Sequence, residues 1–208
     1  MKKNIYLIRH GQTDYNLKGI VQGRGVNSHL NNTGRNQAEK FFNYYKNVRF
    51  DAIYASTLQR THQTVEPFLT LGLKHEVKEA LDEIDWGIFE GVEHDQILEG
   101  TYFSIIESWT SGDLHVKIEG GESPLELQAR QSPFIEELRH AEYENVLICS
   151  HGRAIRALLC GFLDIPLSEM DNFKHNNTCL YKLSVENGVF NVEISNDISH
   201  LTLENAEI

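Results

Sequence analysis

Residues 145–152, NVLICSHG, decide the fold when they are set beside residues 4–11, NIYLIRHG. Each segment is a short apolar run of the kind that forms a buried strand, and each run ends in a histidine followed by a glycine. Residues 51–55, DAIYA, have the same character and lead into the polar run STLQR. We therefore expect three strands of one mostly parallel sheet, with polar side chains at their carboxyl ends.

Helical segments alternate with these strands. A helix is expected over residues 35–48, with Thr33 as its N-cap, because the apolar side chains at Ala38, Phe41, Phe42 and Tyr45 share one face. Ser56 is expected to cap a second helix from Thr57 to about Leu71. The run AIRALLCGFL, residues 154–163, is expected to be a third helix, stopped near Pro166.

The end of the chain predicts a β-hairpin. Two strand-like runs, TCLYKLSV and GVFNVEIS, meet at Asn187-Gly188, a dipeptide that favours a tight hairpin turn. The alternation of strands and helices before it indicates an α/β fold, a sheet covered by helices on both faces, with this hairpin at an antiparallel edge. The apolar period is irregular between about Glu83 and Gly121, so we expect an inserted cap at about 84–121 of a single domain spanning 1–208.

Length and charge exclude several classes of protein. A chain of 208 residues with 40% hydrophobic content buries about 70% of its unfolded surface, enough for one sizeable core. The formal net charge is −11, from 19 basic and 30 acidic side chains, and no basic run is present. Binding to nucleic acid or to an anionic membrane surface is therefore not expected. A small anionic substrate remains compatible, because a few nearby arginines outweigh distant screened charges.

The cysteines and the N-terminus predict a cytoplasmic protein. Three cysteines, Cys149, Cys160 and Cys179, lie in or beside apolar runs and are expected to be buried free thiols. The apolar run at Ile5–Ile8 is too short for a signal peptide, and no window is long enough to span a membrane. Neither HExxH nor a paired Cys/His spacing occurs, so no metal site and no cofactor are predicted.

The chemistry is expected at the strand ends, because ligands of open α/β sheets gather there. His10 and His151 would face one crevice if their strands are neighbours. Either histidine alone is compatible with an ordinary loop residue, and Arg60 alone with a solvated helix cation. Near two histidines, however, the guanidinium of Arg60 is suited to phosphate, whose oxygens it matches in pairs.

Together these residues resemble the histidine phosphatase superfamily, also called the phosphoglycerate-mutase-like family. The resemblance rests on ordered motifs and runs from residue 4 to about residue 203: Leu7–Thr13 with Asn16, Ser56–Arg60, Leu81–Gly87, Ser150–Gly152, and a terminal stretch from Asn196 to Leu201. It implies a three-layer α/β/α sandwich with a small helical cap. It also implies phosphoryl transfer through a phosphohistidine.

The resemblance assigns roles to individual residues. His10 would be the nucleophile, and Arg9, Arg60 and His151 would hold the oxygens of the transferring phosphoryl group without a metal. Glu83 would protonate the leaving oxygen and then activate water. Spacing alone leaves Glu79, Asp82 and Asp85 as alternatives to it; the aligned motif selects Glu83. Hydrogen bonds and close backbone approach to the substrate are expected from Gln12, Thr13, Asn16, Gln22, Gly23 and Gly152.

The chain departs from the family pattern around residues 20–30, where Ile20 precedes Gln22-Gly23 and the following VNSHL is about one residue longer. The outer wall of the pocket therefore cannot be carried over from the family. Arg153, directly after the Ser-His-Gly triplet, could contact an anion, but as a residue of the first helical turn it is expected to face solvent.

The composition of the cap bears on the substrate. Between Ile84 and Gly120 a single basic residue, Lys117, stands against eight acids: Asp85, Glu90, Glu93, Asp95, Glu99, Glu107, Asp113 and Glu119. This net charge of −7 (1 − 8) disfavours a second anionic group on the substrate. The Arg-His-Tyr-Gly segment and the arginine pair that mark phosphoglycerate mutases are also absent. We therefore expect a phosphomonoesterase acting on a small phosphorylated metabolite without a second phosphate.

Alternatives remain at this point. The leaving group would be neutral or cationic and partly apolar, as in α-ribazole phosphate, and five aromatic residues could either wall the pocket or pack inside the cap: Trp86, Phe89, Tyr102, Phe103 and Trp109. A mutase and a pseudoenzyme that only binds phosphorylated ligands stay open, although the five catalytic residues together speak against decay. The sequence leaves the oligomeric state open.

Overall fold

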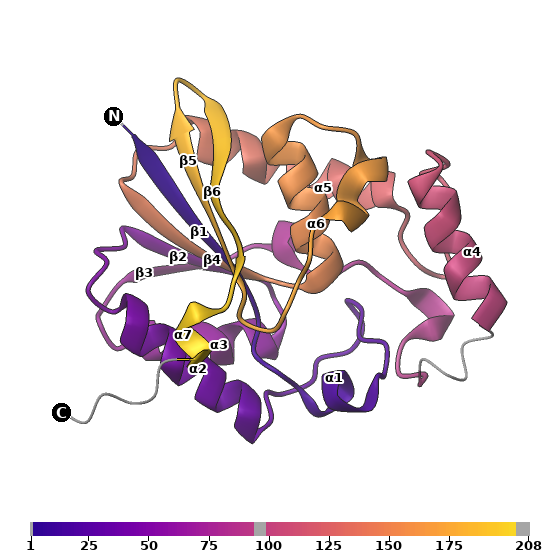
Figure 1. Ribbon diagram of the computed structural model, residues 1–208, viewed down its shortest axis with the longest axis horizontal. Coiled ribbons are helices and arrows are strands. Elements are labelled where there is room, and N and C mark those ends of the chain that lie inside the picture. Colours follow the sequence, from indigo (N-terminus) through magenta and orange to yellow (C-terminus); the bar gives the residue numbers. More distant parts are fainter. Residues whose placement is uncertain (1, 94–98, 203–208) are drawn as a thin grey trace.

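A six-stranded sheet forms the centre of the computed structural model, which describes residues 2–93 and 99–202 (Figure 1). The strands lie in the order β3-β2-β4-β1-β5-β6. Their bounds are Lys3–Arg9 for β1, Ala52–Ala55 for β2, Lys74–Val77 for β3, Asn145–Ser150 for β4, Leu180–Glu186 for β5 and Val189–Asp197 for β6. The strands β1 to β4 are mutually parallel, while β5 and β6 run antiparallel at one edge, as expected.

The two histidine-bearing strands are neighbours. β1 pairs with β4 in parallel, and Arg9 lies opposite Ser150 in the register. His10 and His151 therefore leave the sheet side by side at its carboxyl edge, which confirms that they share one crevice.

Helices cover both faces of the sheet. Their bounds are Asp14–Lys18 for α1, Asn32–Tyr45 for α2, Gln59–Leu69 for α3, Glu99–Thr110 for α4, Pro124–His140 for α5, Gly152–Leu163 for α6 and Ser199–Thr202 for α7. Short 3₁₀ turns lie at Glu79–Leu81 (η1), Gly87–Phe89 (η2) and Leu167–Asn172 (η3). Figure 1 shows α2 and α3 on one side of the sheet and α5 and α6 on the other.

The alternation of side chains along β1 produces these two layers. Ile5 and Leu7 belong to the core shared with α5 and α6, whereas Tyr6 and Ile8 belong to the core shared with α2 and α3. Since successive side chains of a strand point to opposite faces, an unbroken apolar run fills both layers at once. The three-layer α/β/α sandwich is thereby confirmed.

The starts of two helices differ from the sequence-based expectation. Asn31 caps α2, its side-chain oxygen accepting from Gly34 N at 2.9 Å, so Thr33 lies inside the helix. Helix α3 begins at Gln59 after Leu58, which gives no side-chain cap. Ser56 is not its cap, because the Ser56 hydroxyl binds Leu58 N and the ring of His151.

Two elements were not predicted, the helix α5 and the edge strand β3. The signal for α5 was present, since Ser123 and Glu126 form a capping box around Pro124. The hairpin was predicted correctly: Asn187 and Gly188 both adopt positive φ, 51° and 79°, between β5 and β6. Helix α6 ends before Pro166, as expected, with Asp164 in the left-handed region.

The cap, which we define as residues 84–93 and 99–121, shares its apolar core with the body. Trp86, Ile105 and Trp109 of the cap pack in one cluster with Ala157 and Cys160 of α6. Figure 1 shows α4 beyond α6, at the end of the molecule away from β3. The cap is therefore continuous with the α6 layer rather than separate from it.

The three cysteines are buried and unpaired, as expected, and burial raises the pKa of the Cys160 and Cys179 thiols to about 12. Within residues 2–93 and 99–202, none of the helices has the length and apolar character that crossing a membrane requires.

Candidate active site

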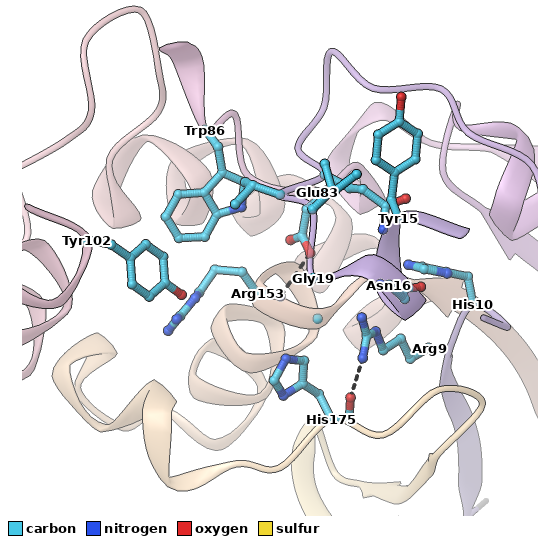
Figure 2. A pocket seen from close by; sticks show the side chains of 14 residues that line it. Arg9, His10, Tyr15, Asn16, Gly19, Glu83, Trp86, Tyr102, Arg153 and His175 are labelled. Carbon is cyan, nitrogen blue, oxygen red and sulfur yellow. Dashed lines mark hydrogen bonds between the residues drawn. The ribbon is translucent and has the colours of Figure 1, made fainter. Parts of the chain in front are cut away.

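A pocket of about 360 Å³ opens at the carboxyl ends of β1 and β4 (Figure 2). It is lined by Arg9, His10, Tyr15, Asn16, Gly19, Ile20, Val21, Gln22, Glu83, Trp86, Tyr102, Gly152, Arg153 and His175. These residues come from both strand ends, from α1 and the loop after it, from the cap and from the loop before β5. Such a volume lies at the small end of the range for ligand sites.

Six of the residues selected from sequence line this pocket: Arg9, His10, Asn16, Gln22, Glu83 and Gly152. Arg60 and His151 are fully buried beside them. Gln12, Thr13 and Gly23 do not line the pocket. The Gln12 amide oxygen accepts from Asn31 at the start of α2.

His10 is held as a neutral imidazole with a defined tautomer. Its Nδ1 lies 2.7 Å from the carbonyl oxygen of Gly11, an acceptor only, so Nδ1 carries the proton and Nε2 keeps its lone pair. Burial, followed by the positive charges of Arg60 and Arg9, lowers the pKa of His10 well below 6.5. The arrangement therefore presents an unprotonated ring nitrogen at neutral pH.

His151 lies beside His10, with ring centroids 5.1 Å apart. Its Nδ1 accepts from Arg60 Nε at 3.0 Å, so its Nε2 carries the proton and donates to Ser56 Oγ at 2.8 Å. Arg60 also donates to the carbonyls of Val26 and Gly23, which ties the loop after α1 to the site. The chain Arg60–His151–Ser56 thus fixes the position of His151 next to His10.

Arg9 brings an unsatisfied donor to the pocket. Its Nη1 donates to the carbonyl of His175 at 2.6 Å, whereas its buried Nε has no hydrogen-bond partner among the described residues. A buried guanidinium N–H without a partner is costly unless a ligand accepts from it. This donor is suited to an anion such as phosphate.

Glu83 is anchored at the start of α6. Its two oxygens accept from Ala154 N at 2.8 Å, Arg153 N at 3.1 Å and its own neighbour Ile84 N at 3.0 Å. It is the one acidic residue that lines the pocket. The alternatives left by spacing are used elsewhere: Glu79 pairs with Arg24, and Asp82 binds Thr57.

Asn16 and Gln22 meet over Thr13. The Asn16 oxygen accepts from Thr13 N at 3.1 Å, within the capping box of α1. The Gln22 oxygen accepts from the hydroxyls of Thr13 and Ser28. Because both amide oxygens are engaged, the amide nitrogens are the groups left to donate to a ligand. Thr13 therefore orients these two side chains from below the pocket surface.

Arg153 does not face solvent, contrary to the expectation from its place in the first turn of α6. It is 7% exposed, its guanidinium lies over the rings of Trp86 and Trp109, and its Nη1 donates to Asp171 at 2.6 Å. The aromatic rings of the cap and a carboxylate of η3 hold it inward, where it lines the pocket.

His175 is a pocket residue that sequence reasoning missed. Its Nδ1 accepts from Arg156 at 3.0 Å, so Nε2 is the protonated nitrogen. Burial and the nearby arginines lower its pKa to about 3, which keeps the ring neutral. The available signal was topological: β5 is antiparallel to β1, so the loop that enters β5 must pass over the carboxyl end of β1.

The cap supplies aromatic walls and leaves its acids outside. Trp86 and Tyr102 line the pocket, whereas Trp109 is buried and Phe103 is 59% exposed. None of the described acidic side chains of the cap lines the pocket; Asp95 and the side chain of Glu99 fall outside the described part. The net charge of the cap therefore does not represent the charge of the pocket, which corrects the argument for a neutral or cationic leaving group.

Among the residues that the structure describes, no group of three or more histidine, cysteine, aspartate or glutamate side chains is arranged to hold a metal ion. The positive charge at the site comes from arginines.

Comparison with known proteins agrees with this site. The chain is 30% identical over 199 residues to a putative phosphoserine phosphatase 2 of Hydrogenobacter thermophilus, covering 95% of this chain and 97% of that protein. The solved structure of YhfR from Bacillus stearothermophilus matches with a TM-score of 0.84 at 30% identity, over 96% of this chain and 99% of that one.

A mycobacterial glucosyl-3-phosphoglycerate phosphatase matches with a TM-score of 0.82 at 26% identity, over 94% of this chain and 99% of that one. The family model for the histidine phosphatase superfamily, branch 1, matches residues 5–198. The chain therefore belongs to the histidine phosphatase superfamily and is a phosphoric monoester hydrolase of that family.

Proposed function

We propose that the protein is a metal-independent phosphomonoesterase that forms a phosphohistidine on His10 and acts on a small phosphorylated metabolite. The observation that carries this proposal is the contact of His10 Nδ1 with the Gly11 carbonyl, which leaves Nε2 as a nucleophile. A neutral imidazole needs no base before it attacks phosphorus.

In the first half-reaction, His10 Nε2 forms a bond to phosphorus as the bond from phosphorus to the leaving oxygen breaks. Glu83 gives its proton to that oxygen, so the product leaves as an alcohol. In the second half-reaction, Glu83 takes a proton from water, the water oxygen bonds to phosphorus, and the P–N bond breaks. Inorganic phosphate and neutral His10 are then regenerated.

The protein's own cations stabilise the transferring group in this proposal. Arg9 offers its unpartnered Nε, and Arg60 contributes charge from beside His151. A phosphate oxygen replaces Ser56 as the acceptor of His151 Nε2–H, while Ser56 keeps its contacts with Leu58 and Thr61. Phosphoryl transfer depends mainly on positioning and charge stabilisation, which these groups supply. The amide nitrogens of Asn16 and Gln22 complete the donor set.

The leaving group in this proposal lacks a second phosphate. The cations that line the pocket are Arg9 and Arg153, and Arg9 is assigned to the transferring phosphoryl group. A second phosphate, with a charge near −2, would meet Arg153 alone.

Turnover of p-nitrophenyl phosphate with EDTA present tests the proposal. We expect turnover by the wild type, none measurable by His10→Ala, and a phosphate adduct on His10 when the reaction is quenched in base. A wild type that is inert towards all phosphomonoesters, or a His10→Ala variant at full rate, contradicts the proposal. Efficient conversion of 3-phosphoglycerate to 2-phosphoglycerate with catalytic 2,3-bisphosphoglycerate would instead identify a mutase.

A further inference from the structure

The guanidinium of Arg153 forms a wall of the pocket opposite the groups that we assign to phosphate. We propose that Arg153 binds a carboxylate on the leaving group, so that the substrate is the phosphomonoester of a small hydroxy or amino acid. This inference rests on the proposed function, because it names the substrate class of the same site. It concerns a residue of α6, which the charge of the cap does not count.

The orientation of Arg153 leaves one edge of the guanidinium for a ligand. Its plane lies over two indole rings, at 5.9 Å from the Trp86 centroid and 5.4 Å from that of Trp109. Its Nη1 is bound to Asp171. Among the described residues, Nε and Nη2 donate to no protein group that we find, and this pair of N–H groups matches the two oxygens of a carboxylate.

The local charge matches one negative group. Arg153 and Arg156 both pair with the same oxygen of Asp171, so two positive charges share one carboxylate. The surplus of one positive charge suits a carboxylate better than a phosphate dianion. His175, neutral beside these arginines, adds an Nε2–H donor without adding charge.

The placement of the two arginines separates two anionic subsites. Figure 2 shows Arg9 and Arg153 reaching the pocket from different sides, with His175 between them. His175 contacts the Arg9 side through its carbonyl and the Arg156 side through its ring. In a pocket of about 360 Å³, a carboxylate at Arg153 and a phosphoryl group at Arg9 leave room for a short carbon chain between them, against Trp86 and Tyr102.

Matched substrates test the inference. O-phosphoserine and O-phosphoethanolamine differ only by a carboxylate, and 3-phosphoglycerate and glycerol 3-phosphate form a second pair without an amine. We expect the wild type to prefer the carboxylated member of each pair in kcat/KM. We expect Arg153→Met to reduce that preference about 10- to 100-fold, the factor associated with hydrogen bonds between charged groups.

Two further variants complete the kinetic test. Arg153→Lys keeps the charge but loses the paired donors and the stacking, so it should retain an intermediate preference. Arg139→Met is the matched control, because Arg139 also lies over an aromatic ring and pairs with an acid, Phe190 and Glu136, but does not line the pocket. It should leave the preference unchanged.

Binding separates failure of this inference from failure of the proposed function. Calorimetry in the His10→Ala background measures the affinity for the same four phosphomonoesters without turnover, with and without Arg153→Met. An inert wild type whose ligands still bind in an Arg153-dependent, carboxylate-dependent way contradicts the phosphatase but supports the carboxylate site. Active enzyme with no preference for carboxylated substrates, or a preference that Arg153→Met leaves intact, overturns the carboxylate site.

Discussion

The imidazole of His175 lies directly on the α carbon of Gly152, so closely that a β carbon at Gly152 would come within 2.4 Å of His175 Cδ2. Gly152 is the first residue of α6, and His175 belongs to the loop before β5. The glycine that follows His151 therefore has a second consequence beyond the helix start: it allows a pocket side chain from a distant segment to approach the site.

Replacing Gly152 by alanine should displace His175 and reduce activity. Because either the ring or the start of α6 must move, we expect the free energy of unfolding to fall by about 1–3 kcal/mol. We also expect kcat/KM for p-nitrophenyl phosphate to fall several-fold. Urea unfolding and steady-state kinetics measure the two effects.

The control for this variant is Gly161→Ala in the same helix. There the new methyl group would meet only the flexible end of Ile135, and activity should be retained. A Gly152→Ala enzyme with wild-type kinetics would show that the position of His175 does not matter for turnover.

Replacing Glu83 by glutamine should produce a loss that depends on the leaving group. An alkyl phosphate needs its leaving oxygen protonated, so kcat should fall about 10²- to 10⁴-fold. The p-nitrophenolate ion leaves without a proton, so the first half-reaction with p-nitrophenyl phosphate should suffer less. Steady-state and burst kinetics on both substrates measure this difference.

Glu79→Gln provides the comparison for Glu83, because Glu79 is an exposed acid four residues earlier that pairs with Arg24 outside the pocket. It should leave both rates unchanged. Equal losses on both substrates in Glu83→Gln would argue that Glu83 positions α6 rather than transferring a proton.

His10 should remain neutral well below pH 6.5. The folded protein lowers its pKa through burial, Arg60 and Arg9, so the nucleophile should stay unprotonated into mildly acid solution. Histidine ¹⁵N NMR at pH 5 should show the Nδ1–H tautomer for His10, whereas the urea-unfolded chain should show protonated imidazole. A positively charged His10 ring in the folded protein at pH 6 would contradict this prediction.

Much of the fold follows from local patterns, because each buried strand is an unbroken apolar run whose alternating side chains fill two layers. The hairpin follows likewise from Asn187-Gly188. The start of α2 was misplaced because Asn31 and Thr33 are both good caps, and only the contact with Gly34 distinguishes them.

The centre of the site could also be predicted, because His10 and His151 sit at strand ends whose adjacency the topology determines. The rest depended on packing between segments far apart in the chain. Arg153 turns inward because Trp86, Trp109 and Asp171 receive it, and no pattern within α6 encodes those partners. The acids of the cap misled for the same reason, since composition does not reveal which side chains line a cavity.

The buried histidines should make the protein less stable as the pH falls. His200 is 1% exposed, packs edge-on against Phe41, and has its pKa lowered to about 4, chiefly by burial. Between that value and the unfolded value near 6.5, the unfolded chain binds more protons than the folded chain. The free energy of unfolding therefore falls as pH drops through this window, and the loss is complete near pH 4.

His200→Gln should weaken that dependence, because glutamine does not titrate and can still bond to Thr178, the partner of His200 Nε2. Urea unfolding at pH 7 and pH 5 should show a loss smaller than that of the wild type by on the order of 1–2 kcal/mol. His175, with a pKa of about 3, contributes the same sign, so part of the dependence should remain in the variant. An identical loss in both proteins, with unchanged denaturant slopes, would show that His200 is not a source of the acid sensitivity.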